Sequence, residues 1–250
     1  MRSRLLFKTS GIVTILLGLV CAGVLFTHNI DQTVTQEDRL YVQKILEEAG
    51  DIPENTGSSS GFEDQIKTIR TLQEAAFHTA PQKGLIPMNH PREPKDLYET
   101  QAAYCSDRAR FMEKALKIYG FDVRFASLYE KKADGNILST LLTKGNEGAH
   151  SHAIIEVKTQ KGWLVVDSRT HWLSLTAGDE PVSLPMLQLM AQKGHWPFWS
   201  PTLKDDMFFL MKHDFYIFYG LYSRHGRFYS PYTPYIPDFD LPQLRLNFQQ

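Results

Sequence analysis

The first thirty residues carry the longest apolar run in the chain. A charge-free stretch covers residues 9–30, its core at residues 11–26 is apolar, and Arg2, Arg4 and Lys8 precede it. The core is a little shorter than the roughly 20 residues of a membrane-spanning helix, but longer than the roughly 7–15 apolar residues of a cleaved signal peptide. We therefore expect residues 1–30 to form a cytoplasmic tail and a signal anchor, with one N-terminal transmembrane helix.

The basic residues predict how this anchor is oriented. Positive charges mark the cytoplasmic end of a membrane helix, so residues from about 31 onward are expected in the periplasm or outside the cell. The protein would then be a single-pass protein of the inner or plasma membrane. Three alternatives stay open: cleavage after Ala22 or Gly23, a lipoprotein at Cys21, and a buried helix of a soluble domain. Val20 disfavours the lipoprotein, because a small residue normally precedes the modified cysteine.

Residues 31–61 predict a stalk. A short amphipathic piece around Leu40, Ile45 and Leu46 is followed by the run Gly57-Ser58-Ser59-Ser60-Gly61. Glycine and serine make flexible linkers, so this segment is expected to hold a domain away from the membrane.

Two helices are predicted after the stalk. Apolar residues recur at helical spacing within residues 62–76, and a proline-interrupted loop covers residues 78–94. Helical spacing returns at residues 109–119, and Gly120 stands where a left-handed cap would end a helix of about residues 100–119. Cys105 falls in the early turns of this second helix.

Three strands follow that helix in the predicted order. Residues 121–130, 153–157 and 163–166 are rich in strand formers, and Gln160-Lys161-Gly162 is the expected turn of a hairpin between the last two. Helices followed by an antiparallel sheet indicate an α+β domain, to which we assign residues 62–195.

Two further segments differ in composition from this domain. Residues 131–150 are polar and contain glycine, which fits either a lid over a site or a passive insertion. Residues 196–239 contain half of the chain's aromatic residues, and prolines interrupt them. We expect residues 196–250 to be a C-terminal extension packed on the domain, whose rings either fill the core or, in part, line a groove for sugar or peptide.

The overall charge is nearly balanced. Lysine and arginine number 27 against 28 aspartate and glutamate, which gives a formal net charge of −1. Such a balance gives no electrostatic reason to expect nucleic acid as a partner.

Cys105 is the candidate nucleophile. It is the only cysteine beyond the N-terminal segment, and an unpaired thiol in an oxidising compartment is easiest to explain if it has a chemical role. A helix N-terminus is one environment that lowers a cysteine pKa. In the predicted hairpin, His152 and Asp167 lie either opposite each other or two residues out of step, and both registers place them on one face of the sheet. The three residues therefore suggest a Cys-His-Asp triad.

These residues resemble the core pattern of the transglutaminase-like superfamily of papain-type cysteine enzymes. The pattern is a cysteine that opens a helix, a glycine before a strand with an arginine, a histidine that begins a strand, and an aspartate that ends the next. The chain carries it as Tyr104-Cys105-Ser106-Asp107-Arg108-Ala109, Tyr119-Gly120-Phe121-Asp122-Val123-Arg124, Ser151-His152-Ala153-Ile154-Ile155-Glu156-Val157 and Gly162-Trp163-Leu164-Val165-Val166-Asp167.

The resemblance covers about residues 95–170 and implies a papain/transglutaminase-like core. It implies Cys105 as nucleophile, His152 as general base and acid, and Asp167 as the group that orients the histidine, with Arg124 as a structural residue. Two positions depart from the usual pattern: Tyr104 stands where glycine or valine is frequent, and Ser168 where proline is usual.

Each candidate residue has a structural alternative. Cys105 could be a small buried hydrophobic residue, and Asp167 could be a turn former. His152 could bond a backbone group or, with His150, form half of a metal site; the other histidines show no ligand spacing, so we predict neither metal nor cofactor. Asp107 and Arg108, which follow Cys105 in the motif, are expected on a solvated helix face.

We therefore predict a membrane-anchored, extracytoplasmic cysteine enzyme that acts on an amide or peptide bond, with hydrolysis favoured over acyl transfer. Its expected partners are a peptide or another amide-containing molecule of the cell envelope, and the membrane. The sequence does not indicate the oligomeric state. The competing hypothesis is a non-catalytic binding or scaffold module of an envelope or polysaccharide-assembly complex.

Overall fold

The computed structural model describes residues 2–50, 52–53, 57–84, 86–131, 151–195 and 214–248. Within them, helices pack on both faces of a four-stranded antiparallel sheet with the strand order β3-β2-β1-β4. This arrangement is the α+β core with an antiparallel sheet that the sequence predicts.

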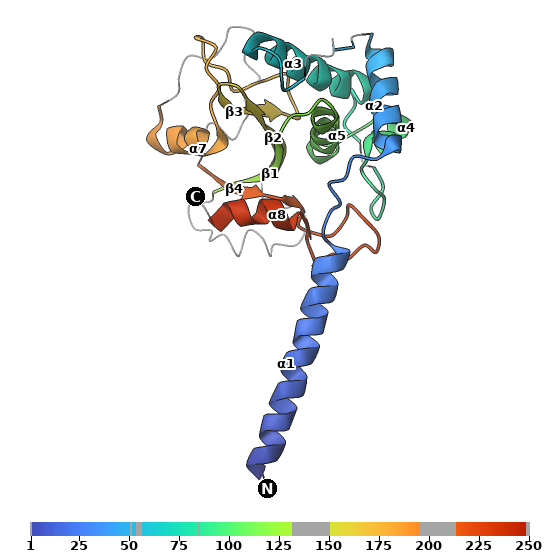
Figure 1. The fold of residues 1–250 in the computed structure, drawn as a ribbon, viewed down its shortest axis with the longest axis vertical. Helices are drawn as coiled ribbons and strands as arrows, with labels where there is room; N and C mark the ends of the chain where they lie inside the picture. The colour runs from blue at the N-terminus through green and yellow to red at the C-terminus, as the bar shows by residue number, and fades with distance from the viewer. Residues whose placement is uncertain are drawn as a thin grey trace.

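Helix α1 (Arg2–Thr27) begins next to the N-terminus and projects away from the globular part of the molecule (Figure 1). Among the helices in the described part of the chain, none is both long and apolar enough to cross a membrane. The predicted transmembrane helix is therefore not found, although the segment is helical over the expected residues.

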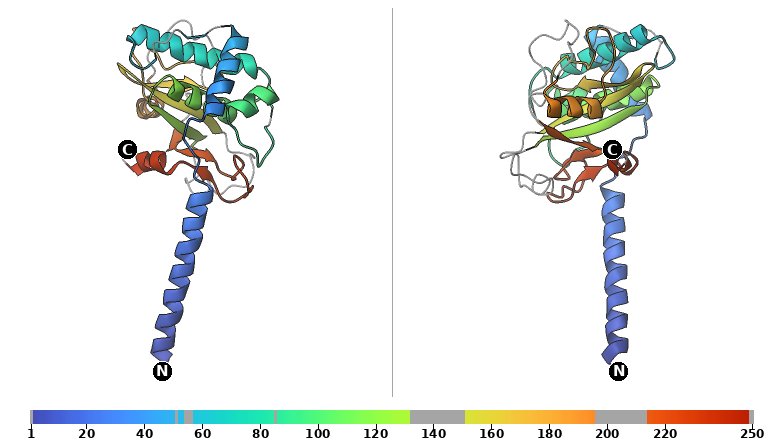
Figure 2. Two further views of the ribbon diagram at one scale, coloured as in Figure 1. Left: turned by 45° about the vertical axis from the view of Figure 1, so that its right-hand side comes forward. Right: turned by 90° about the vertical axis from the view of Figure 1, so that its left-hand side faces the viewer.

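Four helices form the layer on one face of the sheet: α2 (Gln36–Ala49), α3 (Phe62–Thr79), α4 (Pro94–Thr100) and α5 (Cys105–Ile118). Figures 1 and 2 show α2 and α3 outside α5, which lies next to the sheet. Helix α2 differs from the predicted stalk, because Val42, Ile45 and Leu46 are buried in the same apolar cluster as α3 and α5. The apolar positions of this amphipathic piece thus serve the core rather than a spacer.

Strands β1 (Val123–Glu130), β2 (Ser151–Thr159) and β3 (Gly162–Asp167) lie at the predicted places. β2 and β3 form a hairpin in which Thr159 pairs with Gly162 and Ile154 pairs with Asp167. The glycine at the turn has a φ of 140°, which only glycine adopts readily. Helix α7 (Leu184–Lys193) closes the second face of the sheet, where it packs with residues of β1, β2, β3 and β4.

The C-terminal segment contributes to the sheet and to both cores. β4 (Phe215–Tyr219) pairs with β1, and β5 (Leu221–Ser223) pairs with β6 (Asp238–Phe239), followed by α8 (Leu241–Leu244) and a short 3-10 helix (Arg245–Phe248). The predicted extension is therefore integrated into the fold, because β4 is an edge strand of the main sheet. Phe215, Tyr222 and Phe228 are buried, whereas Tyr235 is 72% exposed.

Candidate active site

The helix that carries Cys105 begins at Cys105 itself. Helix α4 ends at Gln101, which has a left-handed φ of 52°, so the predicted helix of about residues 100–119 is two helices separated by a short extended segment. Tyr104 is the extended N-cap of α5, and its backbone N–H donates to Asp107 Oδ2 at 2.9 Å. At the other end, Gly120 has a φ of 81° and supplies the predicted left-handed termination. Cys105 thus lies at the positive end of the helix dipole.

Asp107 and Arg108 are buried, and the predicted solvated helix face is wrong. Asp107 pairs with Arg92 through a 2.6 Å contact between Oδ1 and Nη1, and both side chains are inaccessible to solvent. Arg108 donates from Nε and Nη2 to the carbonyl oxygen of Ala80 at 3.1 and 2.6 Å. Both residues therefore fix the first turn of α5 to the segments around it, a role that no local pattern of charges indicates.

The hairpin brings His152 and Asp167 together two residues out of step. Asp167 pairs with Ile154, so the side chain of His152 lies diagonally across from it, and Nε2 of His152 is 2.6 Å from Asp167 Oδ1. Exposed fractions of 3% for His152 and 1% for Asp167 show that this contact is shielded from water. Cys105 and His152 line the same small cavity, and each affects the pKa of the other, so the structure brings all three predicted residues into one cluster.

The electrostatics of this cluster favour a charged Cys105–His152 pair. Burial alone would raise the pKa of the partly buried Cys105, but hydrogen bonds from His152 and from the Ala153 backbone N–H, together with the charge of His152, lower it overall. Burial would also lower the pKa of His152, yet the carboxylate of Asp167 outweighs it and raises that pKa to about 10. A thiolate beside an imidazolium is the reactive form of a cysteine nucleophile.

Several residues that the sequence did not suggest hold Asp167 in place. Its carboxylate accepts the backbone N–H of Arg169 at 2.8 Å and the hydroxyl of Thr170 at 3.0 Å. Gln73 on α3 donates from Nε2 to the Asp167 carbonyl oxygen at 2.8 Å. Ser168, at the position where the family usually has proline, donates its hydroxyl to the carbonyl of Ala153, the residue after His152. The end of β3 is thus tied to both β2 and α3.

Arg124 makes contacts with two neighbouring strands. Its guanidinium carbon lies 3.7 Å from the ring centroid of Trp163, and Nη1 is 3.8 Å from Glu156 Oε2. Arg124 and Glu156 are also direct partners in the pairing of β1 with β2. It thus links three strands, and it does not line the cavity beside Cys105.

A small cavity of about 50 Å³ opens beside Cys105 and His152. Ser106 and the strands β1 and β2 line one part of it, and the other part comes from β5 and the turn after it, including Arg224, His225 and Arg227. Sequence reasoning missed these three residues, because they lie more than one hundred positions after Cys105 in a segment that suggested only aromatic packing.

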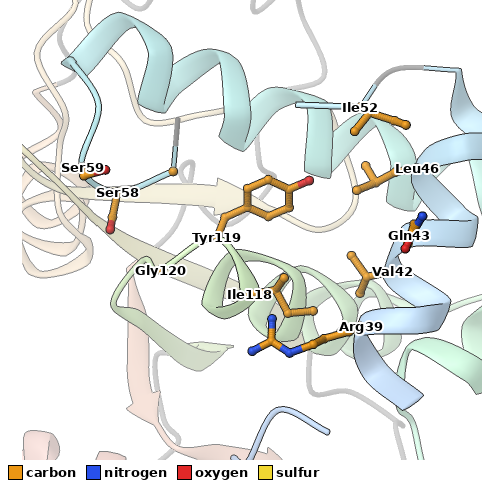
Figure 3. Close-up of a pocket in the computed structure, with 11 residues that line it drawn as sticks. Arg39, Val42, Gln43, Leu46, Ile52, Ser58, Ser59, Ile118, Tyr119 and Gly120 are labelled. Carbon is orange, nitrogen blue, oxygen red and sulfur yellow. The ribbon is translucent and has the colours of Figure 1, made fainter. Parts of the chain in front are cut away.

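A larger cavity lies elsewhere on the molecule. It measures about 760 Å³ and lies between α2 and the end of α5, where Val42, Leu46 and Ile118 form an apolar floor beside Tyr119 (Figure 3). None of the three clustered residues lines it. The predicted lid or insertion at residues 131–150, which includes His150, falls almost entirely outside the described residues, as do the aromatic residues at 196–213.

Comparison with known proteins bears on the family of this domain. Residues 59–168 match the family model of the transglutaminase-like superfamily. The resemblance to that superfamily is therefore confirmed, and the matched segment contains Cys105, His152 and Asp167. A transglutaminase-like domain points to a module of the cysteine-enzyme type.

No curated protein matches the chain. A solved structure similar to this one is a crystal structure of Rad4-Rad23 bound to a 6-4 photoproduct UV lesion, with a TM-score of 0.32 and 9% sequence identity. The match covers 68% of this chain and 41% of that one, so this chain spans less than half of the length of the protein it resembles.

Proposed function

We propose that the protein is a cysteine hydrolase of the transglutaminase-like type, which cleaves an amide or peptide bond with Cys105, His152 and Asp167. The observation that carries this proposal is the continuous chain of contacts from the Cys105 thiol through the His152 ring to the buried Asp167 carboxylate. In this order the carboxylate fixes and charges the ring, and the ring activates the thiol.

The reaction follows from the positions of these groups. The Cys105 thiolate attacks the amide carbon and forms a C–S bond, while the His152 imidazolium gives its proton to the leaving amine. Water, deprotonated by His152, then attacks the thioester, and the acid product leaves as the thiol is restored. The Cys105 backbone N–H at the start of α5 is a donor that could stabilise the oxyanion. An amine in place of water would give acyl transfer.

Trapping of the acyl-enzyme tests this proposal. A short acetylated peptide p-nitrophenyl ester is mixed with the protein, and the released nitrophenolate and the mass of the intact chain are followed. We expect a burst of about one equivalent and an acyl adduct on Cys105, both absent in Cys105→Ala. A folded wild-type protein that gives no burst and no adduct would favour a non-catalytic binding or scaffold module instead.

We also propose that the domain faces the periplasm or cell exterior, on a chain anchored at its N-terminus, and that it acts on peptides or amides of the cell envelope. The support is the sequence pattern of Arg2, Arg4 and Lys8 before a charge-free run. A reporter that is active only outside the cytoplasm, fused after Gln250, is expected to be active. Activity of a cytoplasm-only reporter at the same position would contradict the proposed location.

A further inference from the structure

The cavity beside Cys105 is cationic. Arg224 and Arg227 line it together with His225, and no aspartate or glutamate among the described residues is part of the lining. Arg224 is 8% exposed, and its guanidinium carbon lies 5.2 Å from the ring centroid of Tyr129, a residue that also lines the cavity. Among the described residues, no carboxylate lies within ion-pair distance of Arg227. Arg227 therefore places a positive charge beside a partly desolvated space, which favours an anion.

The turn that presents these residues is held rigidly. The Ser223 hydroxyl oxygen accepts the backbone N–H groups of His225 and Arg227 at 3.2 and 3.4 Å. Gly226 has a φ of 51°, and a Cβ atom there would lie 2.5 Å from the Ile236 carbonyl oxygen, so only glycine fits this close approach. A preorganised turn does not have to order itself when a ligand binds, which favours binding.

We propose that this cavity is an anion subsite, which binds a carboxylate that the substrate carries next to the scissile amide bond. This inference rests on the proposed function and adds the class of substrate. The volume of about 50 Å³ leaves room for a small polar group such as a carboxylate. Arg227 donates to the anion, Arg224 adds positive charge beside it, and Cys105 attacks the amide carbon next to the anion.

A pair of alkylating reagents tests the subsite without a known substrate. Iodoacetate and iodoacetamide form the same C–S bond with the thiolate and release iodide, but only iodoacetate carries a carboxylate beside the reacting carbon. The ratio of their rate constants reports on the anion subsite and cancels any change in the thiolate fraction. The measurement uses the full chain with Cys21→Ser, so that Cys105 is the only thiol.

We expect Arg227→Gln to lower the iodoacetate-to-iodoacetamide ratio about tenfold, as expected for the loss of an ionic hydrogen bond. Arg227→Lys is expected to retain most of the ratio. The matched control is Arg39→Gln, which removes the same charge from an exposed side chain of α2 and is expected to leave the ratio unchanged. If Arg227→Gln and Arg224→Gln, both folded, keep the ratio within twofold of wild type, the subsite is refuted. An iodoacetamide rate at pH 6 equal to that of an ordinary thiol would instead count against the proposed function.

Protection of Cys105 from iodoacetamide distinguishes the source of the carboxylate. The probes are acetyl-Ala-Ala with a free C-terminus, its C-terminal amide, acetyl-Ala-Glu-amide and inorganic phosphate. Protection by the free acid alone assigns the subsite to a terminal carboxylate, protection by the glutamyl amide alone to an acidic side chain, and protection by both to either source. Protection by phosphate alone, or equal protection by the free acid and its uncharged amide, overturns the proposal.

Discussion

The charge of Asp167 is the feature of the site whose removal has the most calculable effect. Asp167→Asn keeps the shape of the side chain, and its remaining oxygen can still accept from His152, so the geometry of the 2.6 Å contact is preserved while the negative charge is lost. Two charges about 4 Å apart at an effective dielectric constant of about 20 attract each other by about 4 kcal/mol. Since 1.36 kcal/mol corresponds to one pKa unit, the pKa of His152 should fall by about three from its value of about 10.

The loss of that charge also affects the ionisation of the Cys105 thiol. The same loss of about 4 kcal/mol weakens the thiolate–imidazolium pair of Cys105 and His152 relative to the neutral thiol–imidazole pair, because the imidazolium no longer has its counter-charge. At pH 6 we expect Asp167→Asn to slow the reaction of Cys105 with iodoacetamide about 100-fold, because the weakened ion pair shifts toward the unreactive protonated thiol. Stopped-flow alkylation of the Cys21→Ser chain measures this rate, and thermal unfolding confirms that the variant is folded.

A matched control separates the charge from the hydrogen bonds around it. Thr170→Val removes the 3.0 Å bond to Asp167 Oδ2 and keeps the carboxylate charged. One neutral donor contributes about 1 kcal/mol, so the alkylation rate should fall by no more than about fivefold. If Asp167→Asn slows alkylation no more than this control does, the charge of Asp167 does not maintain the thiolate–imidazolium pair.

Three further predictions concern the support of the site and the core, and urea unfolding measures each. Gln73→Ala leaves buried carbonyl groups at the end of β3 without their donor, so we expect a loss of about 1–3 kcal/mol, and an unchanged stability would contradict this role. Asp107→Asn leaves the buried Arg92 without a counter-charge and should cost about 3–5 kcal/mol; a cost below 1 kcal/mol would show that the pair does not hold α5 in place. Phe228→Ala should cost about 3–5 kcal/mol, whereas the exposed Tyr235→Ala should change stability by less than about 0.5 kcal/mol, and equal effects would contradict the burial of the C-terminal rings.

Local patterns were sufficient for the elements that carry the candidate site. Strand formers with a Gln160-Lys161-Gly162 turn predict the β2–β3 hairpin, and period-two alternation in that hairpin places His152 and Asp167 on one face, as the Ile154–Asp167 pairing has it. The start of α5 was less predictable. Its first turn depends on the left-handed Gln101 and on the capping contact between Tyr104 and Asp107, which helical periodicity over residues 100–119 does not reveal.

The features that the sequence did not predict depend on contacts between distant parts of the chain. The burial of Asp107 requires Arg92 from the preceding loop, and the cationic lining of the cavity requires Arg224 and Arg227 from the C-terminal segment. The apolar positions of α2 likewise indicate an amphipathic helix, but only its packing against α3 and α5 distinguishes a core helix from a stalk. Periodicity reports which side of an element is apolar, and not which element covers it.

The pH dependence of Cys105 alkylation in the Cys21→Ser chain tests the central claim most directly. Because the pKa of Cys105 is lowered, the thiolate should persist below the usual thiol pKa of about 8.5 and disappear only as the pH falls through the lowered value. We therefore predict that the rate of reaction with iodoacetamide rises with pH through a midpoint below about 8.5. A rate that rises through a midpoint at or above 8.5 would show that His152 does not activate the thiol, and would contradict the proposed nucleophile.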